Sequence, residues 1–178
     1  MVETNDRRLP VGIQSFEEIR KNGYLYVDKT DIIWQLANKG KTYNYLIRPR
    51  RFGKSVLVDT LEAYFMGKKE LFEGLKIMQM ETEWVKRPVI RLDMSRAGAE
   101  PETLRSYLDI TFDRLEKEYG ITPKPTAKLA DRFNAIIVEA YEQTGQQVAI
   151  LIDEYDSPLQ HSWKTPHHEA CTSIYREV

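Results

Sequence analysis

The sequence predicts an α/β domain with a mostly parallel β-sheet. Short apolar segments alternate along it with longer segments whose apolar residues recur every three or four positions. Such alternation is typical of sheets whose strands are joined by helical crossovers. At 178 residues the chain is long enough for about one domain with a real core. We find no internal repeat that would indicate a solenoid.

Two helices and two strands are predicted before residue 48. A capping-box pattern that begins at Ser15 and a helix-ending Gly23 bracket a short helix. Residues 24–27 give a short strand signal, and residues 31–38 have helical spacing. Residues 43–47 form an aromatic and β-branched run, which predicts another strand.

The sequence pattern in the middle of the chain predicts a loop, a helix, a strand and a long helix, in that order. The loop covers residues 48–53, and the helix after it ends at Gly67. Residues 68–86 are ambiguous, with one short helix suggested by their apolar residues. Residues 88–93 predict a strand, and residues 101–119 predict a helix that begins with a proline.

The C-terminal part predicts a further helix and a further strand. A loop with two prolines, residues 122–125, leads into a helix over residues 126–144. Residues 148–152 form a continuous apolar run, which predicts a strand buried on both faces. An acidic turn at residues 153–156 follows, and another helix is expected from about Glu169. The chain thus offers three well-supported strands, which is few for such a sheet.

A candidate phosphate-binding loop, Phe52-Gly53-Lys54-Ser55, lies between a predicted strand and a predicted helix. Gly53 lets the backbone approach a phosphate without a Cβ atom. The N–H groups at the helix start, together with the helix dipole, attract the anion. Lys54 supplies a positive charge for the β and γ phosphates, and Ser55 supplies a hydroxyl for Mg²⁺.

The match to the Walker A pattern G-x-x-x-x-G-K-[ST] is incomplete, because Arg48 stands where the pattern has its first glycine. Pro49 stiffens the loop, and Arg50 and Arg51 make it unusually basic. The alternative interpretation is a basic surface turn before an ordinary helix. At average residue frequencies, G-K-[ST] alone arises by chance in roughly one chain in ten of this length.

The apolar strand at residues 148–152 is followed by Asp153 and Glu154, which is the form of a Walker B motif. The carboxyl end of a parallel strand faces the ligand crevice of the sheet. There Asp153 would hold Mg²⁺, and Glu154 would orient and deprotonate the attacking water. The alternative is a core strand that leaves into a solvated acidic turn. The two motifs occur together in this order in roughly one chain in several hundred, so we predict a nucleotide site.

The charge and the cysteine content argue against several classes of protein. The net charge of −1 argues against a chain that coats nucleic acid along its whole surface. Arg50 and Arg51 are a local basic site, but no interleaved aromatic residues accompany them as in single-strand binders. A single cysteine, Cys171, makes an internal disulfide impossible. With no signal-peptide pattern and no membrane-length apolar run, we expect a cytoplasmic protein that does not engage a membrane.

Other candidate residues have structural interpretations. The spacing of His161, His167, His168 and Cys171 matches no standard zinc site, so the start of a solvated helix is the better interpretation. Residues 28–30 fit either a helix N-cap or a functional motif, about evenly. The three tryptophans are better explained as core or interface anchors than as nucleotide-stacking residues; they are Trp34, Trp84 and Trp163.

Five segments together resemble the AAA-ATPase-like family, and they cover nearly the whole chain. The arginine at the first glycine position is the family's own form of the loop. The segments are Leu9-Pro10-Val11-Gly12-Ile13-Gln14-Ser15-Phe16, Tyr26-Val27-Asp28-Lys29-Thr30, Arg48-Pro49-Arg50-Arg51-Phe52-Gly53-Lys54-Ser55, Pro88-Val89-Ile90-Arg91-Leu92-Asp93 and Asp153-Glu154-Tyr155-Asp156-Ser157-Pro158-Leu159.

The resemblance implies a P-loop NTPase fold with three α/β/α layers and a mostly parallel sheet. It implies that Lys54 binds phosphate, that Ser55 and Asp153 hold Mg²⁺, and that Glu154 is the catalytic base. The nucleotide loop would extend from Arg48 through Pro49, Arg50, Arg51, Phe52, Gly53, Lys54 and Ser55 to Val56.

The resemblance also implies that the chain is the N-terminal part of a longer bacterial protein. Residues 1–40 would precede the phosphate-loop strand, and residues 41–178 would form an incomplete ATPase core, within one domain overall. A later strand would insert between the strand at 43–47 and the strand at 148–152. Family members often continue into a PD-(D/E)XK nuclease-like domain, which would be the part that contacts nucleic acid. Sensor and arginine-finger residues would also lie beyond residue 178.

We therefore expect an ATP-binding, Mg²⁺-dependent ATPase domain that hydrolyses ATP poorly as this chain alone. Its ligands would be ATP and ADP, and a protein partner or a second copy is compatible with the sequence. Two other classes stay open. One is a nucleotide-binding switch or interaction module that does not hydrolyse ATP. The other is a nucleic-acid-processing module, such as a metal-dependent nuclease that uses Asp93, Asp153 and Glu154, although Lys54 has no role in that scheme.

Overall fold

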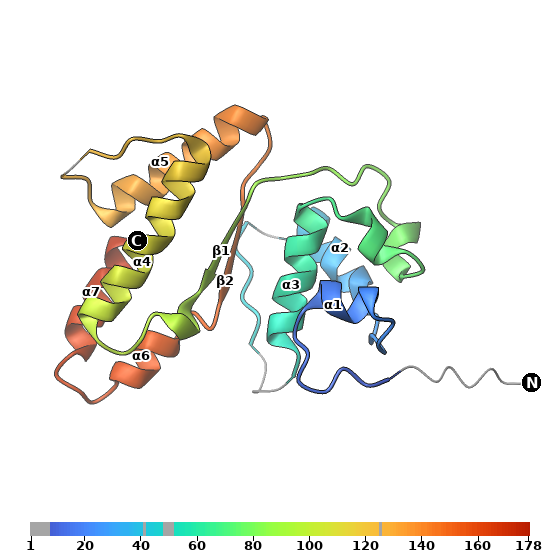
Figure 1. Ribbon diagram of the computed structural model, residues 1–178, viewed down its shortest axis with the longest axis horizontal. Coiled ribbons are helices and arrows are strands. Elements are labelled where there is room, and N and C mark those ends of the chain that lie inside the picture. The colour runs from blue at the N-terminus through green and yellow to red at the C-terminus, as the bar shows by residue number, and fades with distance from the viewer. Residues whose placement is uncertain (1–7, 41, 48–51, 125) are drawn as a thin grey trace, which may run out of the picture. The chain divides into compact units, whose positions relative to one another are not determined.

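The computed structural model describes residues 8–40, 42–47, 52–124 and 126–178 (Figure 1). The chain divides into two compact units, Met1–Lys86 and Arg87–Val178. Among the described residues, no helix is both long enough and apolar enough to cross a membrane.

The described part of the N-terminal unit is built from helices. They are α1 (Phe16–Lys21), α2 (Thr30–Lys39), α3 (Lys54–Phe65) and the 3-10 helices η1 (Lys69–Phe72) and η2 (Lys76–Gln79). The three predicted α-helices are confirmed, and the ambiguous stretch forms the two 3-10 turns. The buried core of this unit consists of Phe16, Ile33, Leu57, Ala63, Tyr64, Leu71, Phe72, Leu75 and Ile77.

Local hydrogen bonds explain where α1 and α2 begin. The Oγ of Ser15 accepts the backbone N–H of Glu18 at 3.3 Å, which is the predicted cap of α1. Asp28 accepts the backbone N–H and the hydroxyl of Thr30 through Oδ1, and the N–H of Lys76 through Oδ2. The buried hydroxyl of Thr30 in turn accepts the N–H of Ile77 at 3.1 Å. Asp28 and Thr30 therefore join α2 to η2, which favours the structural interpretation of residues 28–30.

The two strands predicted in this unit are wrong. Residues 24–27 and 44–47 have no regular secondary structure. In the second segment Tyr43, Tyr45 and Ile47 are at least 80% exposed. A β-propensity reflects the fit of a side chain to a pleated, half-buried surface, and it needs a neighbouring strand to act on. The sheet of the described residues has two strands, both in the other unit, so these segments have no strand partner.

The C-terminal unit is a mixed α/β structure around two parallel strands. β1 (Val89–Asp93) pairs with β2 (Ala149–Asp153) in a register that joins Val89 to Ala149 and Asp93 to Asp153. Parallel neighbours need a crossover connection, which is supplied here by α4 (Pro101–Tyr119) and α5 (Leu129–Thr144). The α/β class and these four predicted elements are confirmed, with α5 beginning at Leu129 rather than at residue 126.

Three further helices complete the unit: η3 (Met94–Arg96), α6 (Ser157–Ser162) and α7 (His168–Glu177). α6 was not expected from the sequence, although Pro158 occupies one of its first two positions, where proline is favoured. In Figure 1, α4, α5 and α7 lie on one side of the strand pair. The buried core is Ile90, Leu92, Met94, Ala97, Leu104, Leu108, Phe112, Leu115, Leu129, Ile136, Cys171 and Ile174.

The expected burial of β2 on both faces is wrong for the described residues. Ile150 is 40% exposed and Ile152 is 47% exposed. β1 is the strand hydrogen-bonded to β2 among the described residues, so β2 has the environment of an edge strand. Trp163, expected as an anchor, is 62% exposed, whereas Trp34 and Trp84 pack against the N-terminal core.

Candidate nucleotide site

The phosphate-loop residues that the structure describes lie at the start of α3. Gly53 precedes the helix with φ +71° and ψ 29°, in the left-handed region that glycine tolerates best. A Cβ atom at Gly53 would meet no atom within 4 Å, so the backbone angle is what favours glycine here. Lys54 and Ser55 are the first two residues of the helix and are half-buried.

The N-terminus of α3 has the character of an anion site. Among the described residues no side chain caps the helix, and its first turn contains no acidic residue. The first N–H groups of a helix lack intrahelical acceptors, and the helix dipole gives them partial positive charge. Phe52, just before the glycine, is 65% exposed. Arg48, Pro49, Arg50 and Arg51 lie outside the described residues.

Contacts within the N-terminal unit hold α3 in place behind this end. Leu57 and Thr60 are buried on the helix, and the hydroxyl of Thr60 donates to the carbonyl of Val56 at 2.7 Å. The backbone N–H of Phe16 donates to Oδ2 of Asp59 at 2.6 Å, which ties α1 to α3. The residues before the loop therefore help to fix the helix that presents Lys54.

The predicted acidic pair lies at the carboxyl end of β2. The side chain of Asp153 is buried, at 7% exposure, and its Oδ1 accepts the backbone N–H of Glu154 at 3.0 Å. Glu154 is half-buried and has φ +49°, an uncommon conformation for a residue with a side chain. The backbone N–H of Ser157 donates to the carbonyl of Glu154 at 2.9 Å, and α6 begins there.

Asp93 ends β1 directly beside Asp153, because the two residues are partners in the parallel register. Its carboxylate accepts the N–H and the hydroxyl of Ser95, the latter at 2.6 Å, and thereby caps η3. Its own N–H donates to the hydroxyl of Tyr107 at 2.8 Å. Among the described residues no three His, Cys, Asp or Glu side chains form a metal-binding group.

Two tyrosines make contacts here that the sequence pattern did not indicate, one at the end of β1 and one at the turn after β2. Tyr107 on α4 receives the N–H of Asp93, and Tyr175 on α7 donates its hydroxyl to the carbonyl of Tyr155 at 2.6 Å. Burial raises the pKa of Tyr175, and the charge of Asp156 raises it further. Both tyrosines stand on amphipathic helices, where an aromatic residue predicts packing and gives no signal of a hydroxyl contact.

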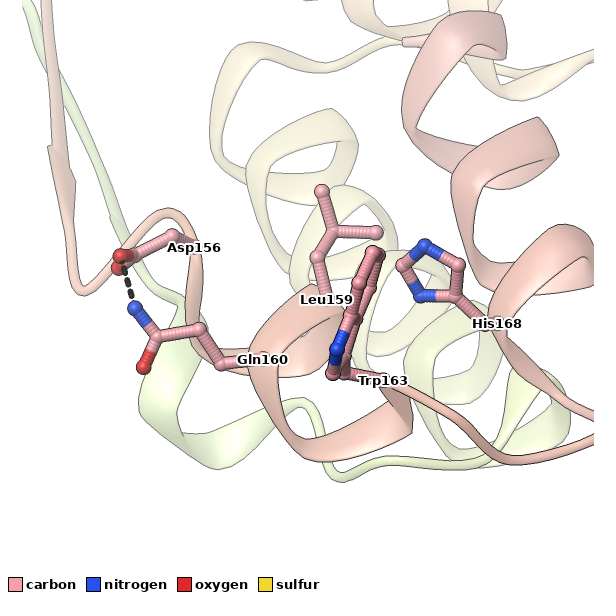
Figure 2. A pocket seen from close by; sticks show the side chains of 5 residues that line it. All are labelled: Asp156, Leu159, Gln160, Trp163 and His168. Carbon is pink, nitrogen blue, oxygen red and sulfur yellow. Dashed lines mark hydrogen bonds between the residues drawn. The ribbon is translucent and has the colours of Figure 1, made fainter.

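A shallow pocket of about 350 Å³ begins in the same turn (Figure 2). It is lined by Asp156, Leu159, Gln160, Trp163 and His168. Figure 2 shows the indole of Trp163 between Leu159 and His168, and the side chains of Asp156 and Gln160 joined by a hydrogen bond. The lining contains an acid and no lysine or arginine, which makes the pocket unsuited to phosphate.

The structure thus brings the predicted residues together in two groups. Lys54, Ser55 and Val56 share the first turn of α3 in the N-terminal unit. Asp153 and Glu154 share the carboxyl end of β2 in the C-terminal unit. The N-terminus of a helix, where the N–H groups and the helix dipole carry partial positive charge, is suited to bind phosphate. A buried carboxylate at the end of a parallel strand is suited to bind a hard cation.

Comparison with known proteins gives two matches. The family model described as predicted AAA-ATPase matches residues 10–178. A protein of Azotobacter chroococcum mcd 1, described as an uncharacterized protein in the vnfD 5′ region, is 37% identical over 156 residues, or 86% of this chain. The chain spans 30% of that relative's length. No solved structure matches. On the match over residues 10–178, the chain belongs to the AAA-ATPase-like family.

Proposed function

We propose that this chain carries the nucleotide-binding part of an ATPase that binds ATP with Mg²⁺ and hydrolyses it in the complete protein. The start of α3 is the observation that carries the proposal. It combines Gly53 in the left-handed region with Lys54 and Ser55 in a first turn that no side chain of the described residues caps. Such a helix end binds anions, and membership of the family supports a nucleotide as the anion.

Each group of residues would have a distinct role. Backbone amides of the loop from Arg48 to Val56 would surround the phosphates, and Lys54 would offset charge that develops on the γ-phosphoryl group. Arg50 and Arg51 would add positive charge to the same loop. Gly53, with its positive φ, would let the backbone approach the phosphates.

The residues present fit Mg²⁺, which prefers oxygen ligands and keeps several waters. Ser55 supplies a hydroxyl oxygen and Asp153 a buried carboxylate, and each would be a Mg²⁺ ligand, directly or through water. Bound there, Mg²⁺ would offset the charge on the β and γ phosphate oxygens. Glu154, the next residue, would accept a proton from the attacking water.

The proposal extends to the fold and setting of the complete protein. Residues 41–178 would form part of a three-layer P-loop core, with residues 1–40 as an extension before it. The parallel pairing of β1 with β2, whose other edge is unpaired among the described residues, is consistent with further strands. The protein would act in the cytoplasm, where ATP is available and Cys171 stays reduced. ATP and ADP are the partners that the site residues support.

Calorimetric titration with Mg-ATP and Mg-ADP tests the phosphate loop. We expect saturable binding by this chain and a loss of at least about tenfold in affinity in Lys54→Ala, since one strong charge contact is removed. Lys69→Ala, an exposed lysine on η1, is the matched control and should bind as the wild type does. Equal binding by Lys54→Ala and the wild type would contradict the assignment of the loop.

Turnover separates an ATPase from a nucleotide switch. In an ATPase, Glu154→Gln should abolish phosphate release while Mg-ATP binding stays within about twofold, because the base acts in the chemical step. A chain that binds Mg-ATP, and whose weak phosphate release does not change in Glu154→Gln, would be a nucleotide-binding module instead.

A further inference from the structure

The turn after β2 is held in an unfavourable backbone conformation. Glu154 has φ +49°, in the left-handed region, although the residue carries a side chain. Residues in sparsely populated backbone regions persist where the surrounding contacts over-determine them, and such residues cluster at functional sites. The contacts that hold this turn therefore bear on where the Glu154 carboxylate lies.

Two of the holding contacts are local to the turn. The N–H of Glu154 donates to Oδ1 of Asp153 at 3.0 Å, and the N–H of Ser157 donates to the carbonyl of Glu154 at 2.9 Å. These hydrogen bonds fix both peptide groups that flank Glu154. They leave the next peptide group, at the carbonyl of Tyr155, to be fixed by another residue.

That residue is Tyr175, which lies twenty positions further along the chain on α7. Its hydroxyl donates to the carbonyl of Tyr155 at 2.6 Å, a short hydrogen bond of good length. A tyrosine hydroxyl keeps its proton throughout the neutral range and so stays a donor, and burial raises the pKa of Tyr175 further.

The helix that carries Tyr175 is itself anchored within the C-terminal unit. Cys171 and Ile174 on α7 are buried in the core beside α4. Near its end, Arg105 on α4 pairs with Glu177 on α7 at 2.9 Å. The core contacts and the ion pair hold α7 in place, so the hydroxyl of Tyr175 can restrain the turn after β2.

We propose that Tyr175 is a positioning residue that fixes the direction of the Glu154 carboxylate through the carbonyl of Tyr155. The proposal rests on the proposed function, in which Glu154 activates water. Loss of the hydroxyl frees the peptide group after Tyr155. The turn that the Ser157 N–H closes onto Glu154 is then less restrained, so the Glu154 carboxylate no longer keeps one direction. Substrate binding does not involve this hydrogen bond, so turnover should change while affinity does not.

Tyr175→Phe, which removes the hydroxyl and keeps the ring, tests the proposal on this whole chain. Amide hydrogen exchange at residues 154–157 should become about fivefold faster, because one hydrogen bond that opposes local opening is lost. kcat for Mg-ATP should fall about tenfold with KM unchanged, as for a group needed only in the chemical step. Tyr141→Phe on α5, whose side chain is 53% exposed, is the matched control and should change neither measurement.

A double substitution separates positioning from general stability. In a Glu154→Gln background, Tyr175→Phe should lower turnover no further, because the group that it positions is already absent. Unchanged exchange at residues 154–157 in Tyr175→Phe would overturn the proposal. So would exchange that accelerates equally through β2 and α7, because the hydroxyl would then support the unit as a whole. A folded wild-type chain that binds no Mg-ATP would contradict the proposed function, and the exchange measurement would then decide by itself whether Tyr175 holds the turn.

Discussion

Asp93 and Asp153 end the two strands of the parallel sheet side by side, as partners in its register. Their surroundings differ although their positions correspond. Asp93 uses its carboxylate to accept two hydrogen bonds from Ser95, whereas Oδ1 of Asp153 accepts the N–H of the next residue. The two aspartates at the carboxyl end of the sheet therefore have different structural roles. Neutralising each one should have a different effect on Mg²⁺ dependence and on stability.

The first prediction concerns this pair of acids. Asp153→Asn should raise the Mg²⁺ concentration needed for ATP binding by about tenfold, because a neutral amide is a weaker ligand for a hard cation. Asp93→Asn should leave the Mg²⁺ requirement unchanged and cost about 1 kcal/mol of stability through its weakened contacts with Ser95. Titration of ATP binding with Mg²⁺, alongside thermal unfolding, measures both. An equal shift in Mg²⁺ requirement for the two variants would assign Asp93 to the metal site as well.

The second prediction separates the backbone role of Gly53 from its role in binding. Gly53→Ala should cost about 1 kcal/mol of stability, because alanine disfavours a φ of +71°. A Cβ atom there meets nothing within 4 Å, so no clash adds to that cost. Gly74→Ala is a close control, since Gly74 has φ +74° and equally open surroundings. We expect similar losses of melting temperature in both variants.

Mg-ATP affinity is the measurement that should distinguish the two glycine variants. A change of backbone angle at Gly53 turns the N–H groups at the start of α3 away from the phosphates, whereas Gly74 lies between the two 3-10 helices. We expect affinity to fall only in Gly53→Ala, by about tenfold. Retained affinity in a folded Gly53→Ala protein would show that the loop geometry does not depend on this residue.

Much of the helical structure could be predicted from the sequence, because caps and periodicity are local signals. Ser15 caps α1 and Pro101 begins α4, as the sequence predicts. The strands were less predictable, because pairing depends on residues distant in sequence. The runs at 88–93 and 148–152 pair with each other as β1 and β2. The similar run at 43–47 forms no strand in the part of the chain that the structure describes.

For the candidate site, the motif residues could be named from the sequence, whereas the residues that hold them in place could not. Lys54, Ser55, Asp153 and Glu154 are recognisable from motif spacing, and the structure places them at a helix start and a strand end. Tyr175 reaches the same turn from twenty residues away, and nothing in its local pattern distinguishes it from a packing residue. Supporting contacts of this kind arise from tertiary structure, so a motif does not contain them.

The third prediction concerns Glu81, which hydrogen-bonds the core residue Tyr64 to the turn that follows η2. Its carboxylate accepts the hydroxyl of Tyr64 and the backbone N–H groups of Thr82 and Glu83. Burial alone raises the pKa of Glu81, but these hydrogen bonds outweigh it and hold the pKa below its usual range. Glu81→Gln should therefore destabilise the protein by about 1–3 kcal/mol at neutral pH.

The sign of the pH dependence follows from the lowered pKa of Glu81. A carboxyl group whose pKa is lower in the folded state stabilises the protein above its unfolded pKa, about 4.3. That contribution is lost as the pH falls through the lower, folded pKa. The stability difference between wild type and Glu81→Gln, measured by urea unfolding, should be constant from about pH 6 to 8 and shrink below about pH 4. A difference that grows on acidification would contradict this assignment.

The last prediction concerns Arg132, which joins α5 to α4. Its guanidinium is 11% exposed and pairs with Asp109, Asp113 and Glu116 at 2.6–2.8 Å. Glu116 is 2% exposed, so Arg132→Gln leaves a buried, uncompensated carboxylate and should cost about 3–5 kcal/mol. Arg132→Met with Glu116→Leu removes both charges and should recover most of that loss, because an apolar pair fills the same space. Urea unfolding of the three proteins measures this. If the double variant were as unstable as Arg132→Gln, the hydrogen bonds of the pair would contribute more than the burial of its charges costs.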